Sequence, residues 1–148
     1  MKKLPKLNRL SRGKKLFVQT YLTMFLIRLG MLLLPFNRLQ NLVLKTRVMN
    51  FLAIAKSQVT LGRIILAVHR SSKYSPGKVM CLARALTTAV LMNIYELPYE
   101  LKIGVAKGES GRLDAHAWVV SEGKIIMGNL PDLSRYVAMS SSGGGLIV

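Results

Sequence analysis

The sequence predicts an α+β fold, in which a helical region precedes one further helix and an antiparallel sheet. Apolar residues recur at helical spacing through residues 16–70, whereas they alternate with other residues between positions 101 and 120. A turn-rich segment, residues 71–77, separates the two patterns. We therefore expect three regions in the 148 residues: a basic helical region (1–70), a compact core (71–139) and a flexible tail rich in Ser and Gly (140–148).

Three helices are expected in the first region. The first occupies the apolar stretch from Leu16 to Phe36 and ends near Leu34, because Pro35 cannot continue a helix. The second runs from about residue 38 to 56. The third runs from about residue 57 to 70, with Ser57 as a plausible N-cap.

The first helix has the composition of a segment that could meet a membrane. Seven Lys/Arg in residues 2–15 precede it, but Arg28 interrupts it and leaves an uncharged run of 12 residues before it and one of 9 after it, up to Arg38. Each run is shorter than the roughly 18–20 residues that a spanning helix needs. The stretch has four polar residues that form no continuous polar face on a helix: Gln19, Thr20, Thr23 and Arg28. We expect it to pack on the rest of the protein or on a partner, with peripheral contact at a lipid surface as the alternative.

Charge is distributed unevenly along the chain. Residues 1–95 carry 17 Lys/Arg and no acidic residue, whereas residues 96–148 carry 5 Lys/Arg and 6 Asp/Glu. Such a basic half attracts polyanions, namely nucleic acid, anionic lipid or an acidic peptide. No recognised nucleic-acid-binding motif accompanies the charge, so nucleic acid is not expected as a partner.

The second half predicts a helix followed by an antiparallel meander. The helix begins near Cys81 and ends near Tyr95, before Leu97-Pro98. Alternation predicts strands over residues 101–106 and 115–120, joined by a hairpin connection at 107–112. A turn at 121–124 leads to a short strand at 125–127.

Cys81 and His116 are the candidate catalytic pair. The chain has one cysteine, so an intramolecular disulfide is excluded and a reducing, cytoplasmic location is expected. A helix N-terminus stabilises a thiolate, and its free N–H groups can form an oxyanion hole. An imidazole on a facing strand can take the thiol proton and later deliver it to a leaving amine. Neither a cofactor nor a metal is expected.

A third side chain usually fixes the tautomer of such an imidazole. Asn129 is the preferred candidate and Asp132 the alternative, because both follow the strand that comes after His116. Trp118 is interpreted as a core residue, and no chemistry is assigned to His69.

At these residues the sequence resembles the transglutaminase-like leader peptidases of lasso-peptide biosynthesis. The resemblance covers residues 62–137, and the basic helical region matches more loosely. The matching segments are Pro76-Gly77, Cys81-Leu82, Arg84-Ala85-Leu86, Ile103-Gly104-Val105, Ala115-His116-Ala117-Trp118-Val119, Gly123 and Leu130-Pro131-Asp132-Leu133-Ser134-Arg135-Tyr136. The resemblance implies a transglutaminase- or papain-like core, in which the catalytic helix packs on an antiparallel sheet.

The resemblance also implies a function and partners. It implies a cysteine protease that removes the leader from a ribosomally synthesised precursor peptide. Its partners would be a PqqD-like leader-recognition protein and an asparagine-synthetase-like lasso cyclase. The third catalytic residue of the family is an aspartate, and the aligned position here is Asn129. Two alternatives therefore stay open: a transglutaminase-like acyl transferase, and a catalytically impaired scaffold for the maturation complex.

Overall fold

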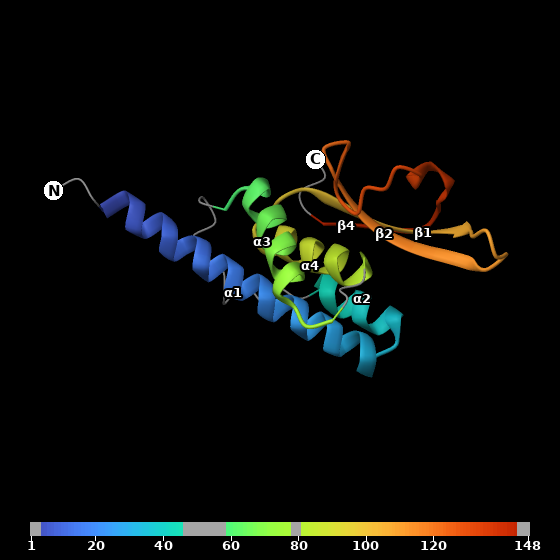
Figure 1. Cartoon of the computed structure of the whole chain (residues 1–148), viewed down its shortest axis with the longest axis horizontal. Coiled ribbons are helices and arrows are strands. Elements are labelled where there is room, and N and C mark those ends of the chain that lie inside the picture. The colour runs from blue at the N-terminus through green and yellow to red at the C-terminus, as the bar shows by residue number, and fades with distance from the viewer. Residues whose placement is uncertain (1–3, 46–58, 78–80, 145–148) are drawn as a thin grey trace.

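Four helices lie on one side of a four-stranded antiparallel sheet in the computed structural model of this protein, and the last of the four packs against the sheet (Figure 1). The structure describes residues 4–45, 59–77 and 81–144. The helices are α1 (Leu4–Leu33), α2 (Phe36–Lys45), α3 (Leu61–Tyr74) and α4 (Cys81–Ile94). The strands are β1 (Tyr99–Lys107), β2 (Leu113–Ser121), β3 (Lys124–Met127) and β4 (Val137–Gly144), with a 3₁₀ turn at Leu133–Arg135. This architecture confirms the α+β prediction.

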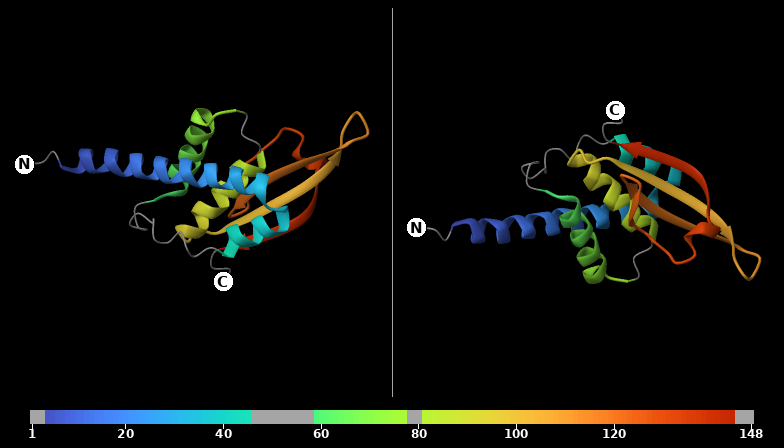
Figure 2. Two further views of the ribbon diagram at one scale, coloured as in Figure 1. Left: turned by 90° about the horizontal axis from the view of Figure 1, so that it is seen from below. Right: turned by 90° about the horizontal axis from the view of Figure 1, so that it is seen from above.

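Helix α4 lies at the centre of the molecule, between the other helices and the sheet (Figures 1 and 2). Ten of its fourteen residues are buried, so it is the core helix. Its two buried threonines, Thr87 and Thr88, donate their hydroxyl protons to carbonyls four residues earlier, which satisfies them without an outside partner. Buried side chains of α1, α3, α4, β1 and β2 form one continuous hydrophobic core. The predicted helical region therefore shares its core with the rest of the chain.

The sheet has the strand order β3-β2-β1-β4. The long β1–β2 hairpin pairs Gly104 with His116 and places His116 in the middle of the sheet. A two-residue turn joins β2 to β3, with φ of 49° at Glu122 and 77° at Gly123. Positive φ at both central residues is the hairpin geometry that matches the twist of the strands. The meander predicted from residues 101–127 is thus present.

The element boundaries differ from the predictions at several places. Pro35 ends α1 as predicted, and α1 closes at Leu33. The predicted second helix is described only as far as Lys45, and the candidate cap Ser57 lies outside the described residues. The third helix begins after Thr60 and continues to Tyr74, through most of the predicted break, because Ser71 is buried against the core.

The Ser/Gly tail was predicted to be flexible, and for residues 140–144 this was wrong. These residues extend strand β4, which pairs with β1 from Tyr99↔Gly144 to Val105↔Val137. The free edge of β1 supplies backbone hydrogen bonds to any chain laid beside it, whatever its side chains are. Serine and glycine composition does not oppose that pairing strongly enough to keep the segment out of the sheet.

Candidate active site

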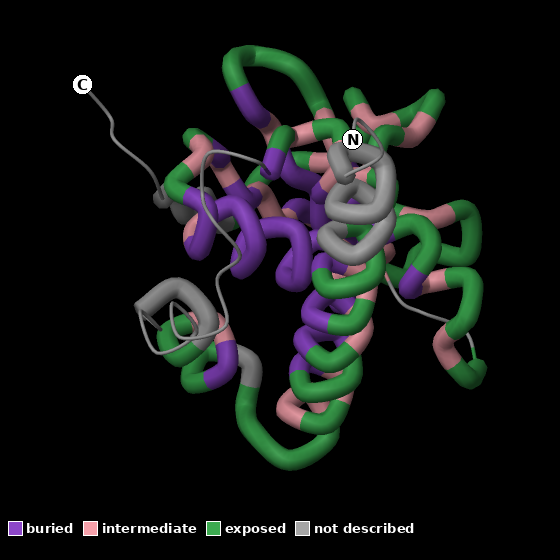
Figure 3. Tube along the Cα trace, turned by 90° about the vertical axis from the view of Figure 1, so that its left-hand side faces the viewer, coloured by how far each residue is buried: buried purple, intermediate pink, exposed green. Residues whose placement is uncertain are grey.

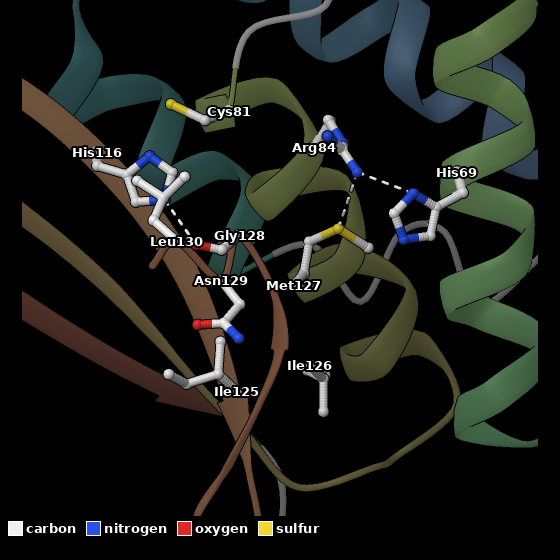
Figure 4. A pocket seen from close by; sticks show the side chains of 10 residues that line it. All are labelled: His69, Cys81, Arg84, His116, Ile125, Ile126, Met127, Gly128, Asn129 and Leu130. Atoms are coloured by element: carbon white, nitrogen blue, oxygen red, sulfur yellow. Dashed lines mark hydrogen bonds between the residues drawn. The ribbon is translucent and has the colours of Figure 1, made fainter. Parts of the chain in front are cut away.

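A pocket of about 430 Å³ opens beside the N-terminal end of α4 (Figure 4). It lies between this helix end, α3 and the segment that follows β3. Ten residues line it: His69, Cys81, Arg84, His116, Ile125, Ile126, Met127, Gly128, Asn129 and Leu130. Both predicted catalytic residues are therefore found in one cavity.

Cys81 is the first residue of α4, as predicted, and carries a free, half-buried thiol. The backbone N–H groups of a first helical turn have no partner within the helix and carry partial positive charge. No acidic residue lies in this first turn to oppose that charge. The helix end thus offers N–H donors for an oxyanion formed beside Sγ.

His116 is buried on β2, and a backbone carbonyl fixes its ring. Its Nε2 lies 2.6 Å from the carbonyl oxygen of Gly128. Because a carbonyl can only accept, Nε2 must carry the proton of this hydrogen bond. In the neutral imidazole this leaves Nδ1 unprotonated, as an acceptor for the proton of a thiol. Figure 4 shows this second nitrogen on the side of the ring nearer Cys81.

Gly128 can make this contact because it has no side chain. Its φ is +81°, and a Cβ added here would lie 2.5 Å from the carbonyl oxygen of Ala117 and 3.0 Å from the Cα of Trp118. The chain after β3 therefore crosses β2 at very close range. That crossing brings the Gly128 carbonyl to the imidazole.

Two aromatic rings restrict the orientation of His116. The ring of Trp118 is stacked with it, with centroids 6.2 Å apart and planes inclined by 14°. The ring of Tyr136 lies 5.5 Å away at 48°. Trp118 is itself buried, as predicted for a core residue, and packs over Gly104, where a Cβ would lie 2.9 Å from the indole. The imidazole is thus positioned by ring contacts as well as by the carbonyl.

Among the hydrogen bonds of the described residues, none joins Cys81 to His116. In enzymes without substrate, catalytic hydrogen bonds are often long and tighten only in the complex. The arrangement supplies a thiol on a helix end, an imidazole with a fixed tautomer, and room for substrate between them.

Neither predicted third residue accepts the N–H of His116. Asn129 is exposed and lines the pocket, directly after the glycine whose carbonyl takes that role. Asp132 lies on the surface and pairs with Arg135, with Oδ2 2.6 Å from Nε. The ring is therefore held by a neutral backbone acceptor, which orients it but stabilises an imidazolium less than a carboxylate would.

Arg84 and His69 are pocket residues that the sequence interpretation did not assign to the site. Arg84 lies one helical turn after Cys81, and its Nη2 is 2.9 Å from Nδ1 of His69 and 3.7 Å from Sδ of Met127 (Figure 4). Arginine can only donate, so Nδ1 of His69 accepts and this ring is neutral. Partial burial and the charge of Arg84 lower the pKa of His69 below its ordinary value of 6.5. The i, i+3 spacing from Cys81 is the signal that could have identified Arg84.

Arg84 supplies the only formal charge among the residues that line the pocket when both histidines are neutral. Its buried Nε has no hydrogen-bond partner among the described residues. Within that part of the chain, no cluster of three or more His, Cys, Asp or Glu could hold a metal ion. The thiol of Cys81 and the imidazole of His116 are the candidate nucleophile and base among the lining residues.

Comparison with known proteins gives one match. A model of the transglutaminase-like superfamily matches residues 25–141, which includes the last third of α1, every lining residue of the pocket and most of β4. No curated protein and no solved structure matches the chain.

Proposed function

We propose that this chain, which belongs to the transglutaminase-like superfamily, is a cysteine peptidase that removes the leader from a ribosomally made precursor peptide during lasso-peptide maturation. The superfamily contains cysteine peptidases and acyltransferases. One observation supports thiol chemistry most directly: Cys81 at the start of α4 and His116, with Nε2 bonded to Gly128, line the same pocket. The resemblance of residues 62–137 to leader peptidases supports the choice of substrate.

Acylation begins when the scissile carbonyl of the leader's last residue enters between Cys81 and His116. His116 Nδ1 takes the proton of the thiol, and Sγ attacks the carbonyl carbon. The electron pair of the carbonyl moves to its oxygen, beside the free N–H groups of the first turn of α4. When the tetrahedral intermediate collapses, the C–N bond breaks and the imidazolium delivers its proton to the departing amine.

Deacylation regenerates the thiol. His116 takes a proton from water, the resulting hydroxide attacks the thioester carbon, and the C–S bond breaks. The leader leaves with a new C-terminal carboxylate, and the proton returns to sulfur. The freed α-amine of the core peptide is then available for macrolactam formation by an asparagine-synthetase-like cyclase, with a PqqD-like protein presenting the leader.

The decisive experiment follows the mass of a precursor peptide incubated with the protein and its leader-recognition partner. Two fragments should appear, and Cys81→Ala and His116→Ala should each lower the rate at least about a thousandfold. Since Cys81 is the single cysteine, iodoacetamide should add one adduct and abolish cleavage. Ser110→Ala, in the exposed β1–β2 turn, serves as the matched control and should cleave at the parent rate.

Other outcomes would contradict the proposal. Incorporation of an added amine at the cleavage position, with no hydrolysis, would identify an acyl transferase. A precursor that binds but stays intact would identify a scaffold. That outcome would be consistent with a backbone carbonyl, instead of a carboxylate, at Nε2 of His116. Asn129→Ala separates the two accounts of the third group. We expect Asn129→Ala to lower the rate of precursor cleavage by less than about tenfold. Removal of a side chain that fixes the imidazole tautomer lowers kcat by about 10⁴-fold.

A further inference from the structure

The outward side of α1 carries a continuous apolar surface. Its seven large apolar residues are between 42% and 83% exposed: Val18, Leu22, Phe25, Leu26, Leu29, Leu32 and Leu33. Their spacing of three and four places them on one side of the helix, and at 1.5 Å per residue they extend over about 23 Å. We name these seven residues the α1 outer face. Surface helices of globular proteins normally turn their polar residues to water, and α1 does the reverse.

The opposite side of α1 is fixed to the body of the protein. Its buried residues include Met24 and Ile27, in the common core, and Gln19, whose Oε1 accepts a 2.6 Å hydrogen bond from the hydroxyl of Tyr95. Arg28 donates to the hydroxyl of Ser75 and to the carbonyl of Pro76. Figure 3 shows the buried turns of α1 on the side next to the other buried helices and the exposed turns on the other side.

These contacts limit how α1 could meet a membrane. By length and composition, Gly13–Leu33 is the one segment of the described helices that could cross a bilayer, but a third of it is buried in the protein. Inserting it across the bilayer would separate Gln19 from Tyr95 and Arg28 from Ser75. A helix that keeps these bonds and presents one apolar side can instead lie in the plane of the bilayer surface.

Charge identifies the kind of surface. Lys14 and Lys15 are exposed at the start of the α1 outer face, on either side of it in helical projection. Five further Lys/Arg lie in residues 2–12, and no acidic residue occurs before position 96. Each Lys or Arg near an anionic bilayer strengthens binding by about fivefold. We propose that the α1 outer face binds the surface of an anionic lipid bilayer and holds the protein there with the pocket outside the membrane.

A protein partner fits the same features less well. Protein interfaces have an apolar centre enriched in aromatic residues and a polar rim around it. Between residues 16 and 33 every exposed residue of α1 is apolar, and all but Phe25 are aliphatic. An apolar strip that continues into an exclusively basic segment is the pattern of interfacial membrane helices.

The test is co-flotation of the full chain with vesicles, without any substrate, so that it is independent of the proposed peptidase activity. Vesicles with one third anionic lipid should bind the protein, and purely zwitterionic vesicles should bind it at least about tenfold less. Two double variants should each bind anionic vesicles about tenfold or more weakly than the parent: Leu26→Ser/Leu29→Ser and Lys14→Glu/Lys15→Glu. Leu113→Ser/Val137→Ser removes exposed apolar residues of the sheet and is the matched control, expected to bind like the parent.

Circular dichroism and the unfolding midpoint establish that each variant is folded. Equal binding by the parent and the α1 variants would overturn the proposal, and so would failure to bind anionic vesicles at low salt. A third outcome also overturns it. Light scattering could show that the parent forms a dimer or binds a leader-recognition protein, that the Leu26→Ser/Leu29→Ser variant does neither, and that the parent does not bind vesicles. In that case the α1 outer face is a protein interface.

Discussion

Helices α1 and α4 are both rich in apolar residues, yet their surroundings differ completely. Helix α4 is covered on every side, with ten of fourteen residues buried between the other helices and the sheet. Helix α1 uses one side for the core and leaves the other exposed, and only a third of Gly13–Leu33 is buried. Both bury threonines that donate to carbonyls four residues earlier, Thr20 and Thr23 in α1 and Thr87 and Thr88 in α4.

The difference shows that apolar composition does not by itself say what covers a helix. In α4 the sequence and the environment agree, because an apolar helix is covered by the other helices and the sheet. In α1 the environment accounts for one side of the helix only. The other side is exposed among the described residues, and a lipid surface is proposed for it.

The largest expected effect is a difference between the two helices in how strongly a Leu→Ala substitution destabilises the protein. Leu86 is fully buried in α4 and Leu26 is 55% exposed in α1. Leu86→Ala should lower the free energy of unfolding by about 3 kcal/mol, because it leaves a cavity in a close-packed core. Leu26→Ala should change it by less than about 0.5 kcal/mol. Guanidinium titrations without lipid measure both, and a comparable loss for Leu26→Ala would mean that the α1 outer face is covered within the protein.

The parts of the structure that sequence predicted are those with a periodic or local signal. Helical spacing after Cys81 and alternation around His116 identified the two elements that carry the candidate pair. The acceptor for His116 could not be found in this way, because the carbonyl of Gly128 is a backbone group, and a glycine after a strand indicates a turn and not a hydrogen-bond partner. Asn129, one position later, was the closest that side-chain reasoning could come.

Two other features escaped prediction because they depend on tertiary contacts. Residues 140–144 pair with β1 because its edge is free, although their composition suggests a loose segment. In α1, the polar residues Gln19, Thr20 and Thr23 are turned inward. Periodicity had indicated an apolar helix, but it could not say which side meets the core when both sides are apolar.

An intermediate effect is expected where α1 contacts the connection that leads to the candidate nucleophile. Arg28 on α1 donates to the hydroxyl of Ser75 and to the carbonyl of Pro76, at 2.8 and 2.7 Å, a few residues before Cys81. Arg28→Met keeps most of the side-chain volume and removes both hydrogen bonds. We expect it to lower the free energy of unfolding by about 1 kcal/mol. We also expect it to lower kcat of the proposed precursor cleavage by a larger factor than it raises KM.

Arg112→Met provides the control for Arg28, because Arg112 is exposed in the β1–β2 turn and distant from this connection in the chain. It should leave both the unfolding free energy and kcat near the parent values. If Arg28→Met and Arg112→Met behave alike in both measurements, the contact between α1 and the connection does not position Cys81. The two helices would then be independent in function, although they share a core.

The smallest effect concerns the contact between α3 and α4, through His69 and Arg84. The pKa of His69 is lowered, first by partial burial and then by the charge of Arg84, so the folded protein binds a proton here less readily than the unfolded chain does. The contribution of this group to stability is therefore full above the ordinary pKa of 6.5 and is lost as the pH falls below it. His69→Gln should flatten the decline in unfolding free energy between pH 7.5 and pH 5.5, by a small amount because the side chain is exposed. Unfolding titrations of both proteins at the two pH values measure the difference. An unchanged pH dependence would mean that the charge of Arg84 does not oppose protonation of His69.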